Sequence, residues 1–156
     1  MEFQKDEQCS QNQTLLKSLK DRIADNPAVV ALGTTDALIR ANGDVEFIMP
    51  VKYEHTNTHG IVHGGIFVTL LDTVMGYACY FKSDQHGTVT LNINTSFIAN
   101  CTPGSTVKAV GRTIHAGRRV MVAEGEIYDE TGRLLCTGQG TFYAKGDAKN
   151  TETITN

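Results

Sequence analysis

Residues 63–81 read HGGIFVTLLDTVMGYACYF, and this stretch carries most of the information about the fold. Twelve of the sixteen residues from 66 to 81 are apolar. The four exceptions are Thr69, Asp72, Thr73 and Gly76. On a helix they fall at i, i+3, i+4 and i+7, so they form one narrow polar stripe on an otherwise apolar surface. A helix of this kind is predicted to be buried, either in a protein core or in a membrane.

Asp72 and the two glycines that precede the apolar run indicate chemistry. Burial of an ionised carboxylate without partners is very costly, so we expect Asp72 to be paired, protonated or active in a cleft. Gly64 and Gly65 have no side chains to cover the first backbone N–H groups of the helix. An electropositive helix start about two turns before a lone acid is typical of a site where a carbonyl group is polarised and attacked.

The composition of the 156-residue chain argues against several classes of protein. With 40% apolar residues it can form one domain with a substantial core, and its formal net charge of −3 argues against nucleic-acid binding. The first residues lack the basic-then-apolar pattern of a signal sequence, and Thr69 and Asp72 interrupt the longest apolar run, so no membrane span is predicted. The four cysteines are scattered without a CxxC pair, which favours a reducing, cytoplasmic location.

The N-terminal third of the chain contains a predicted helix and two predicted strands. Residues 1–13 are polar and glutamine-rich, so we expect them to be disordered ahead of a single domain over residues 14–145. Apolar residues at helical spacing predict a helix that starts near Leu15 and ends before Pro27. Residues 29–40 and 44–51 read as strands, and the Asn-Gly pair between them predicts a hairpin.

The rest of the chain is a polar loop, the long helix and four more strands. The loop covers residues 53–62, and the strand-like segments are 87–100, 105–115, 120–128 and 133–144. Strands joined by short turns form an antiparallel meander, and such a sheet can curl round the helix and bury it without a membrane. The predicted class is α+β. Residues 146–156 are small and polar, and we expect a flexible tail there.

The motif HGGIFVTLLD at residues 63–72 resembles the signature of the hotdog-fold acyl-CoA thioesterases of the phenylacetate-pathway (PaaI-like) group. The resemblance extends over residues 27–145, and the run EHTN at residues 54–57 is similar to the branch that includes the mammalian thioesterase-superfamily proteins. It implies a hotdog fold, in which an antiparallel sheet wraps round one long central helix. It also implies an enzyme that hydrolyses an acyl-CoA to free CoA and a carboxylic acid, with no metal or redox cofactor.

The resemblance implies roles for the helix start and its acid. Asp72 corresponds to the catalytic carboxylate, which acts as general base or nucleophile. The backbone N–H of Gly64, helped by that of Gly65, corresponds to the donor that polarises the thioester carbonyl. In this fold the helix start of one subunit faces the carboxylate of another, so the resemblance implies a homodimer or a homotetramer.

Three further residues correspond to polar groups near the reaction centre. Asn57 and His63 match residues that flank it, and Thr90 matches a hydroxyl that orients water or the carboxylate. Two of them, Asn57 and Thr90, also have a simpler interpretation. Asn57 fits an ordinary turn, and Thr90 shares a predicted strand face with Asn92 and Asn94, which fits an outer or subunit-facing surface.

The histidines before the helix superficially suggest a metal site. His55, His59 and His63 are spaced four residues apart. Asn57 and Gly60 lie between them and argue against a continuous helix, and cysteine or acidic ligands are missing at zinc spacing. We therefore predict that the chain binds no metal.

The turn formed by Gly117, Arg118 and Arg119 is a candidate site for the CoA moiety of the substrate. Arginines on a turn are most often simply solvated. CoA, however, carries several phosphate charges, and an acidic protein needs a local cationic patch to bind it. Basic turns of this kind also contact the nucleotide in members of the family that the motif resembles.

Two other functions remain open. A hotdog dehydratase or hydratase would also act on acyl thioesters, but its typical histidine-containing turn is not found in this sequence. A non-enzymatic acyl-CoA-binding or regulatory protein would keep the CoA groove but would not need Asp72. Hydrolysis is therefore the favoured reaction, and the sequence leaves the acyl group undetermined.

Overall fold

The computed structural model describes residues 2–83 and 87–145. The expected tail over residues 146–156 lies outside the described residues. In chain order the elements are α1 (Glu2–Ala24), α2 (Pro27–Leu32), β1 (Asp36–Ile39), β2 (Val45–Pro50), the 3₁₀ turn η1 (Tyr53–His55), α3 (Gly64–Lys82), β3 (Thr88–Phe97), β4 (Thr106–Ala116), β5 (Val120–Asp129) and β6 (Leu134–Ala144).

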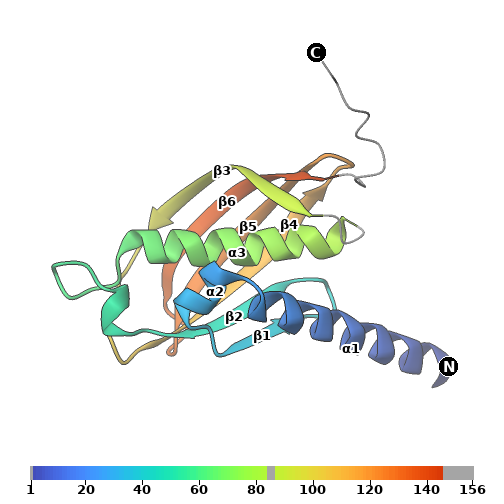
Figure 1. The fold of residues 1–156 in the computed structure, drawn as a ribbon, viewed down its shortest axis with the longest axis horizontal. Coiled ribbons are helices and arrows are strands. Elements are labelled where there is room, and N and C mark those ends of the chain that lie inside the picture. The colour runs from blue at the N-terminus through green and yellow to red at the C-terminus, as the bar shows by residue number, and fades with distance from the viewer. Residues whose placement is uncertain (1, 84–86, 146–156) are drawn as a thin grey trace, which may run out of the picture.

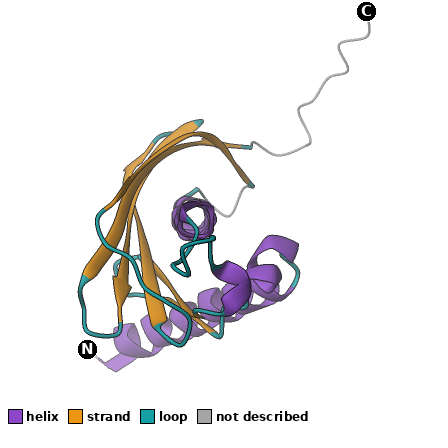
Figure 2. Ribbon diagram, turned by 90° about the vertical axis from the view of Figure 1, so that its left-hand side faces the viewer, coloured by secondary structure: helices purple, strands orange, loops and turns teal. Residues whose placement is uncertain are grey.

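One antiparallel sheet curls round α3. The strand order is β1-β2-β4-β5-β6-β3, and α3 lies along the concave side of the sheet (Figure 1). The helices α1 and α2 lie on the side of α3 that the sheet leaves open (Figures 1 and 2). The predicted α+β class and the single long central helix are therefore confirmed. By length and composition alone α3 could cross a membrane, but here it packs on five strands of the sheet, β2 to β6, and supplies much of the core.

Close packing between α3 and the sheet fixes the position of the helix. Leu70, Leu71 and Met75 of α3 are fully buried against the strands. A Cβ atom at Gly111 of β4 would lie 2.5 Å from the backbone carbon and oxygen of Val74, so only glycine permits this approach. The apolar run in the sequence is therefore explained by burial against a curved sheet.

The region between α1 and β1 differs from the prediction, because residues 27–32 form a helix and not the start of a strand. The Asn26 side chain caps α2 by accepting hydrogen bonds from the backbone N–H groups of Ala28 and Val29. Pro27 occupies the first helical turn, and Gly33 ends the helix with φ +67°. The Asn42-Gly43 hairpin between β1 and β2 is confirmed.

The N-terminal helix also differs from the prediction. It begins at Glu2, whereas we expected residues 1–13 to be disordered. No glycine or proline lies between residues 2 and 24, and the glutamate, glutamine and lysine residues there favour a helix. Helix propensity therefore extended the element well beyond its amphipathic part.

The strand order differs from a simple meander. β3 does not pair with β4, which follows it in the chain, but with β6, and so it lies at one edge of the sheet. The segment after β3 runs across the end of the sheet, where the N–H groups of Ile98 and Ala99 both donate to the carbonyl oxygen of Leu135. This crossover places β3 alongside the polar stripe of α3.

Candidate active site

The start of α3 exposes one backbone donor. His63 caps the helix, because its Nδ1 accepts a 2.9 Å hydrogen bond from the N–H of Gly65. The N–H of Gly64 donates no hydrogen bond within the part of the chain that the structure describes. We expected both glycines to offer their N–H groups, but that of Gly65 is occupied by the cap, so only Gly64 presents a free donor.

Gly64 leaves room for an aromatic side chain at the first position of α3. A Cβ atom at Gly64 would lie 3.1 Å from the ring of Phe97, at the end of β3, so a larger residue would require that exposed ring to shift by a few tenths of an ångström. Glycine itself places no side chain over the positive end of the helix, where a carbonyl oxygen or an anion can bind.

Asp72 lies in the middle of α3 and is held by Thr90. The Thr90 hydroxyl donates a 2.7 Å hydrogen bond to Oδ1 of Asp72. Asp72 is only half-buried, and it lines a cavity of about 370 Å³ together with Thr69, Thr73 and Gly76, the other residues of the polar stripe. Of the three situations that the sequence allowed for Asp72 (paired, protonated or active in a cleft), the structure shows a hydrogen-bonded carboxylate at a cavity, and its activity there stays a prediction.

A β-bulge places Thr90 on the same side of the sheet as Asp72. The sequence alternation put Thr90 on one face with Asn92 and Asn94, and this prediction is wrong. The register of β3 against β6 shifts between Thr90 and Asn92. Thr90 lies opposite the buried Phe142, and Asn92, two residues later on β3, lies opposite Thr141, which is only one residue away on β6. The extra residue reverses the alternation. Thr90 therefore faces α3, and the two asparagines face the other side.

The loop before α3 is held by backbone hydrogen bonds. Oδ1 of Asn57 accepts a 2.9 Å hydrogen bond from the N–H of His59, which is the simple turn role that the sequence allowed. The carbonyl oxygen of His55 accepts a hydrogen bond from the N–H of His63, so the loop determines where α3 begins. Asn57 lies in the same loop, where its N–H donates to the carbonyl oxygen of Ile61, and it does not line the Asp72 cavity.

His55 is a structural residue of this loop. It is 3% exposed, and its Nδ1 accepts a 3.1 Å hydrogen bond from the N–H of Lys52. Burial lowers the pKa of His55 below its usual value of 6.5, because the charged form is poorly solvated. His55 and His63 both use Nδ1 as a backbone acceptor, and the described residues contain no cluster of three or more histidine, cysteine or acidic groups that could hold a metal.

The helix start and the carboxylate cannot act on the same carbonyl group within one chain. Asp72 lies eight residues after Gly64, which corresponds to about 12 Å along the helix axis. A reacting carbonyl must lie about 3 Å from its hydrogen-bond donor and equally close to the attacking group. The Gly64 N–H and the Asp72 carboxylate are therefore two separate polar features of the chain.

The predicted CoA-binding turn lies apart from the Gly64 N–H and from the Asp72 cavity. The N–H of Gly117 donates to the carbonyl oxygen of Val120, which closes the turn between β4 and β5. Arg118 and Arg119 are exposed, and neither lines the Asp72 cavity. The carbonyl oxygen of Arg119 accepts from the N–H of Ala144, so the turn is anchored to the end of β6 next to the start of β3.

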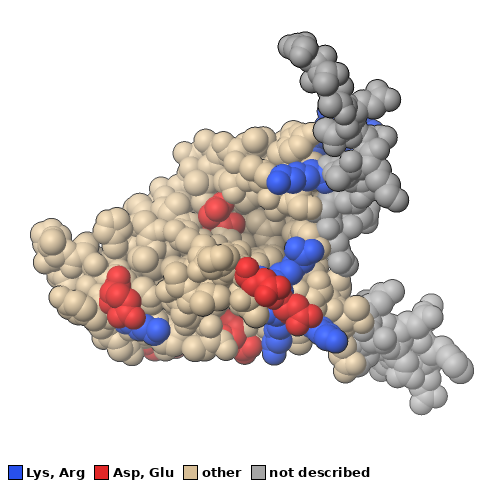
Figure 3. Space-filling view, viewed as in Figure 1, with Lys and Arg blue, Asp and Glu red and all other residues tan. Residues whose placement is uncertain are grey.

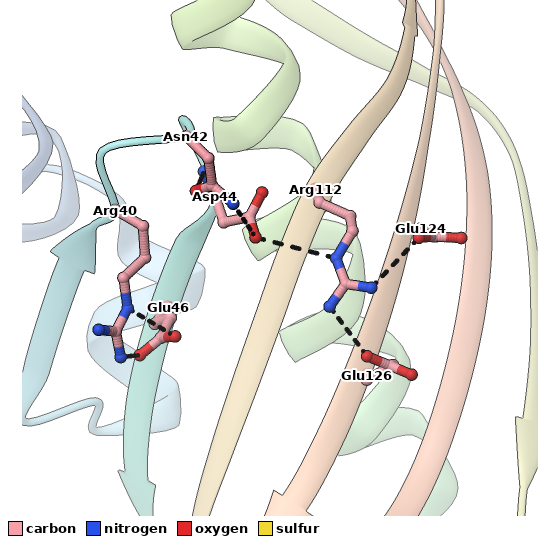
Figure 4. A network of polar contacts seen from close by, with 7 residues as sticks. All are labelled: Arg40, Asn42, Asp44, Glu46, Arg112, Glu124 and Glu126. Carbon is pink, nitrogen blue, oxygen red and sulfur yellow. Dashed lines mark hydrogen bonds and ion pairs between the residues drawn. The ribbon is translucent and has the colours of Figure 1, made fainter.

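Most charged side chains lie away from the α3 stripe. The face seen in Figure 3 is largely uncharged over α3 and β3, apart from an acidic group near its middle, and many of its acidic and basic groups lie toward α1. On the face of the sheet turned away from α3, Arg112 is paired with Asp44, Glu124 and Glu126 (Figure 4). These ion pairs are local to the outer surface of the sheet and do not reach Asp72.

Sequence reasoning missed the contribution of the N-terminal helices to the cavity. Arg22 of α1 and Asn26 line it from one side, facing Tyr77 and Tyr80 of α3. A signal for the α3 residues was present, because Tyr77 and Tyr80 continue the stripe at the same spacing as Thr73 and Gly76. No comparable signal marked Arg22 or Asn26.

Comparison with known proteins decides the family. Residues 59–136 match the family described as the Thioesterase superfamily, and this segment contains both the start of α3 and Asp72. The chain belongs to the thioesterase superfamily. The predicted enzyme class of this thioesterase, a thioester hydrolase, is confirmed at the level of the family.

This thioesterase is 32% identical over 113 residues to the 1,4-dihydroxy-2-naphthoyl-CoA hydrolase of Escherichia coli (strain K12), covering 70% of this chain and 82% of the relative. It is 25% identical over 111 residues to acyl-coenzyme A thioesterase 13 of Pongo abelii, covering 70% and 79% of the two chains. The E. coli PaaI protein from the phenylacetic acid degradation operon has a TM-score of 0.77 over 86% of this chain and 96% of its own, at 23% identity. That likeness bears on the fold alone, and the predicted hotdog fold is confirmed.

Proposed function

We propose that this thioesterase hydrolyses acyl-CoA to free CoA and a carboxylic acid, with Asp72 of one chain and the Gly64 N–H of another acting on the same thioester. The observation that carries the proposal is the Asp72 carboxylate, which Thr90 holds at a cavity on the helix whose first N–H is free. The CoA thioesters named for the two relatives support the choice of substrate class.

Two routes are compatible with this arrangement. As general base, Asp72 takes a proton from water, and the resulting hydroxide attacks the carbonyl carbon. As nucleophile, Asp72 attacks the carbon directly, CoA leaves as thiolate, and water then hydrolyses the mixed anhydride. In both routes the Gly64 N–H stabilises negative charge on the carbonyl oxygen, an interaction that strengthens as the charge develops. The thiolate leaves and takes up a proton, and no external oxidant or reductant is involved.

We propose that a second copy supplies the missing half of the site. β3 is an edge strand and exposes Val89, Leu91 and Phe97. An edge strand has unpaired backbone groups, so two copies can join through β3 and extend the sheet through both chains. The minimal assembly is a homodimer, and the sequence-based expectation of a dimer of dimers remains part of this proposal.

The CoA moiety is assigned to the turn with Arg118 and Arg119. Both guanidinium groups are exposed at the end of the sheet where β3 begins, and guanidinium groups bind phosphate oxygens in bidentate fashion. The protein has a net charge of −3, so phosphate binding needs a local cationic patch, and this turn provides two adjacent arginines. A cytoplasmic location, where acyl-CoA is available, is part of the same proposal.

Complementation of two inactive variants tests the shared site. Gly64→Pro removes the N–H donor at a position where a helix accepts proline, and Asp72→Asn removes the carboxylate. Each variant alone should lose thiol release from a panel of aryl- and fatty-acyl-CoAs. After subunit exchange, the mixture should recover roughly a quarter of the parent activity, because half of the dimers are mixed and each of these has one intact site.

Two controls separate the outcomes. Each variant taken alone through the same subunit-exchange procedure must stay inactive. Sedimentation must show that both variants assemble as the parent does. No recovery in a mixture shown to contain mixed dimers would contradict the shared site. Lack of hydrolysis of every CoA thioester by the parent would contradict the proposed function itself.

A further inference from the structure

A row of exposed apolar side chains crosses one end of the sheet. Tyr143 of β6 pairs with Val120 of β5 on one side and with Val89 of β3 on the other. Phe142 and Met121, which alternate with Tyr143 and Val120 along their strands, are buried in the core. The row therefore points to the outer face of the sheet, which is turned away from α3. The exposed fractions are 36% for Tyr143, 45% for Val120 and 43% for Val89.

The apolar row differs from the rest of the outer face. Farther along the sheet, the outward-facing rows consist of polar side chains, namely Asn94, Gln139 and Glu124 in one row and Ser96, Thr137 and Glu126 in the next. The two glutamates of these rows are paired with Arg112. A tyrosine ring between two exposed valines is instead a flat apolar surface, which is suited to contact with a ligand or a partner.

The apolar row lies next to three basic side chains. Arg118 and Arg119 form the turn that leads into β5, and Lys145 follows the end of β6. The N–H of Ala144 donates a 2.9 Å hydrogen bond to the carbonyl oxygen of Arg119, so the three cations lie at the same end of the sheet. All three are exposed, and none forms an ion pair with another described residue. Their charge is therefore available to an anion.

The Asp72 cavity extends to this same end of the sheet. Gly87 and Thr88, at the start of β3, line it together with Asp72, and Gly87 is exposed. The carbonyl oxygen of Gly87 accepts a 2.6 Å hydrogen bond from the N–H of Lys145. A ligand that lies at Asp72 can therefore reach the cations and Tyr143 by passing over the end of the sheet beside Gly87.

This combination of groups suits a nucleotide. Guanidinium and ammonium groups bind phosphate oxygens, and an aromatic side chain exposed on a sheet is a platform on which a base stacks. CoA carries both parts, because its phosphates and its adenine ring lie at the end of a flexible pantetheine arm. A second copy of the chain fits less well, since a two-fold contact through this end would bring two sets of like charges together.

We propose that Tyr143 and Val120 bind the adenine ring of the CoA moiety. Lys145 joins Arg118 and Arg119 in binding its phosphates. The inference rests on the proposed function, because it takes the thioester to lie in the cavity described above. It goes beyond that function by assigning the contact with the base. Because β6 lies between β3 and β5, pairing of two copies at the edge strand β3 leaves the tyrosine ring accessible.

The test is the effect of Tyr143→Ala on substrates that carry or lack the nucleotide. The same acyl group is supplied as acyl-CoA and as acyl-phosphopantetheine, which lacks the adenosine part. For acyl-CoA we expect KM to rise by about tenfold with kcat unchanged, as for loss of one base–aromatic stack. For acyl-phosphopantetheine the variant should match the parent. Lys145→Ala should raise KM for acyl-CoA and weaken its salt dependence.

Matched variants isolate the ring. Tyr143→Phe keeps the aromatic surface and should bind acyl-CoA as the parent does. Tyr143→Val, with a residue suited to a strand, covers the case in which the alanine variant does not fold, and it should show the same loss. Tyr53→Ala removes a more exposed tyrosine from another part of the surface and should leave both KM values unchanged.

A binding measurement separates this proposal from the proposed function. Calorimetry with adenosine 3′,5′-bisphosphate, the nucleotide end of CoA, should show weaker binding to Tyr143→Ala than to the parent. If the parent hydrolyses no thioester, the proposed function fails and this measurement alone decides the role of Tyr143. Equal losses for acyl-CoA and acyl-phosphopantetheine, or no nucleotide binding by the parent, would overturn the proposal. Altered sedimentation of Tyr143→Ala with an unchanged KM would also overturn it and would assign this end of the sheet to a second copy.

Discussion

The hydroxyl of Thr90 donates a 2.7 Å hydrogen bond to Oδ1 of Asp72, across the gap between an edge strand and the central helix. The contact depends on the β-bulge after Thr90, because regular alternation beyond that point would orient the strand differently. We assign Thr90 no contact with the proposed substrate. It is a positioning residue that fixes one carboxylate oxygen and leaves the other free.

Replacement of Thr90 by valine should lower kcat by about tenfold, because a hydrogen bond to a charged group is lost and Asp72 gains rotational freedom. KM should change little, since no substrate contact is removed. Steady-state kinetics with an acyl-CoA identified in the panel measures both constants. Thr90→Ser retains the hydroxyl and should recover most of the activity, so failure of serine to rescue would assign Thr90 a packing role instead.

Replacement of Asp72 by asparagine tests the carboxylate directly. The variant keeps the shape and can still accept a hydrogen bond from Thr90, so it should fold, assemble and bind acyl-CoA. Its kcat should fall by about a hundred- to ten-thousandfold, the range for loss of a positioned base. Near-normal turnover in a correctly folded variant would remove Asp72 from the mechanism, and collapse of the fold would favour a structural acid.

Two substitutions at Gly64 separate the N–H donor from the space around it. Gly64→Pro deletes the donor, and His63 before it already has the extended backbone, with ψ 131°, that proline requires. We expect kcat to fall by about a hundredfold or more, as for other oxyanion-type donors. Gly64→Ala adds a Cβ near Phe97 but keeps the N–H, so it should lose much less. Equal losses in both variants would indicate that crowding by Phe97 is responsible.

The double replacement of Arg118 and Arg119 by alanine tests the CoA site. Both side chains are exposed and neither lines the Asp72 cavity, so kcat should be retained while KM for acyl-CoA rises by about tenfold. The salt dependence of KM should also weaken, because two phosphate contacts are lost. Lys20→Ala and Lys108→Ala, which remove charges elsewhere, provide the control. A lowered melting temperature with unchanged KM would indicate a structural turn.

The buried His55 predicts an acid-sensitive component of stability. Burial lowers the pKa of His55 in the folded protein below its usual 6.5, so the unfolded chain binds the proton more readily. This stability is fully present above pH 6.5 and is lost as the pH falls from 6.5 through the folded-state pKa. Denaturant unfolding at pH 7.5 and 5.5 should show a smaller loss in His55→Gln than in the parent. His59→Gln, at an exposed position, should behave as the parent does.

The local pattern of the sequence was sufficient for the central helix and its polar stripe. Helical spacing is a property of consecutive residues, so Asp72 and Thr73 could be placed on one face before any partner was known. The same holds for the Asn42-Gly43 hairpin, whose turn conformation is set by those two residues. The capping signals at Asn26, Pro27 and Gly33 were also present in the sequence, although the apolar residues between them suggested a strand.

Only the tertiary structure could decide which side Thr90 faces, which strand lies beside β3, and what closes the Asp72 cavity. The bulge after Thr90 arises from pairing with β6, about fifty residues later in the chain. The Tyr77 hydroxyl joins α3 to the N-terminal segment through its hydrogen bonds with the carbonyl oxygen of Arg22 and the side-chain amide of Asn26. Such contacts have no period in the sequence, because they depend on how the curved sheet and the helices pack in space. The sequence by itself determined that an acid would sit on a buried helix with an open start, and packing decided what that acid can reach.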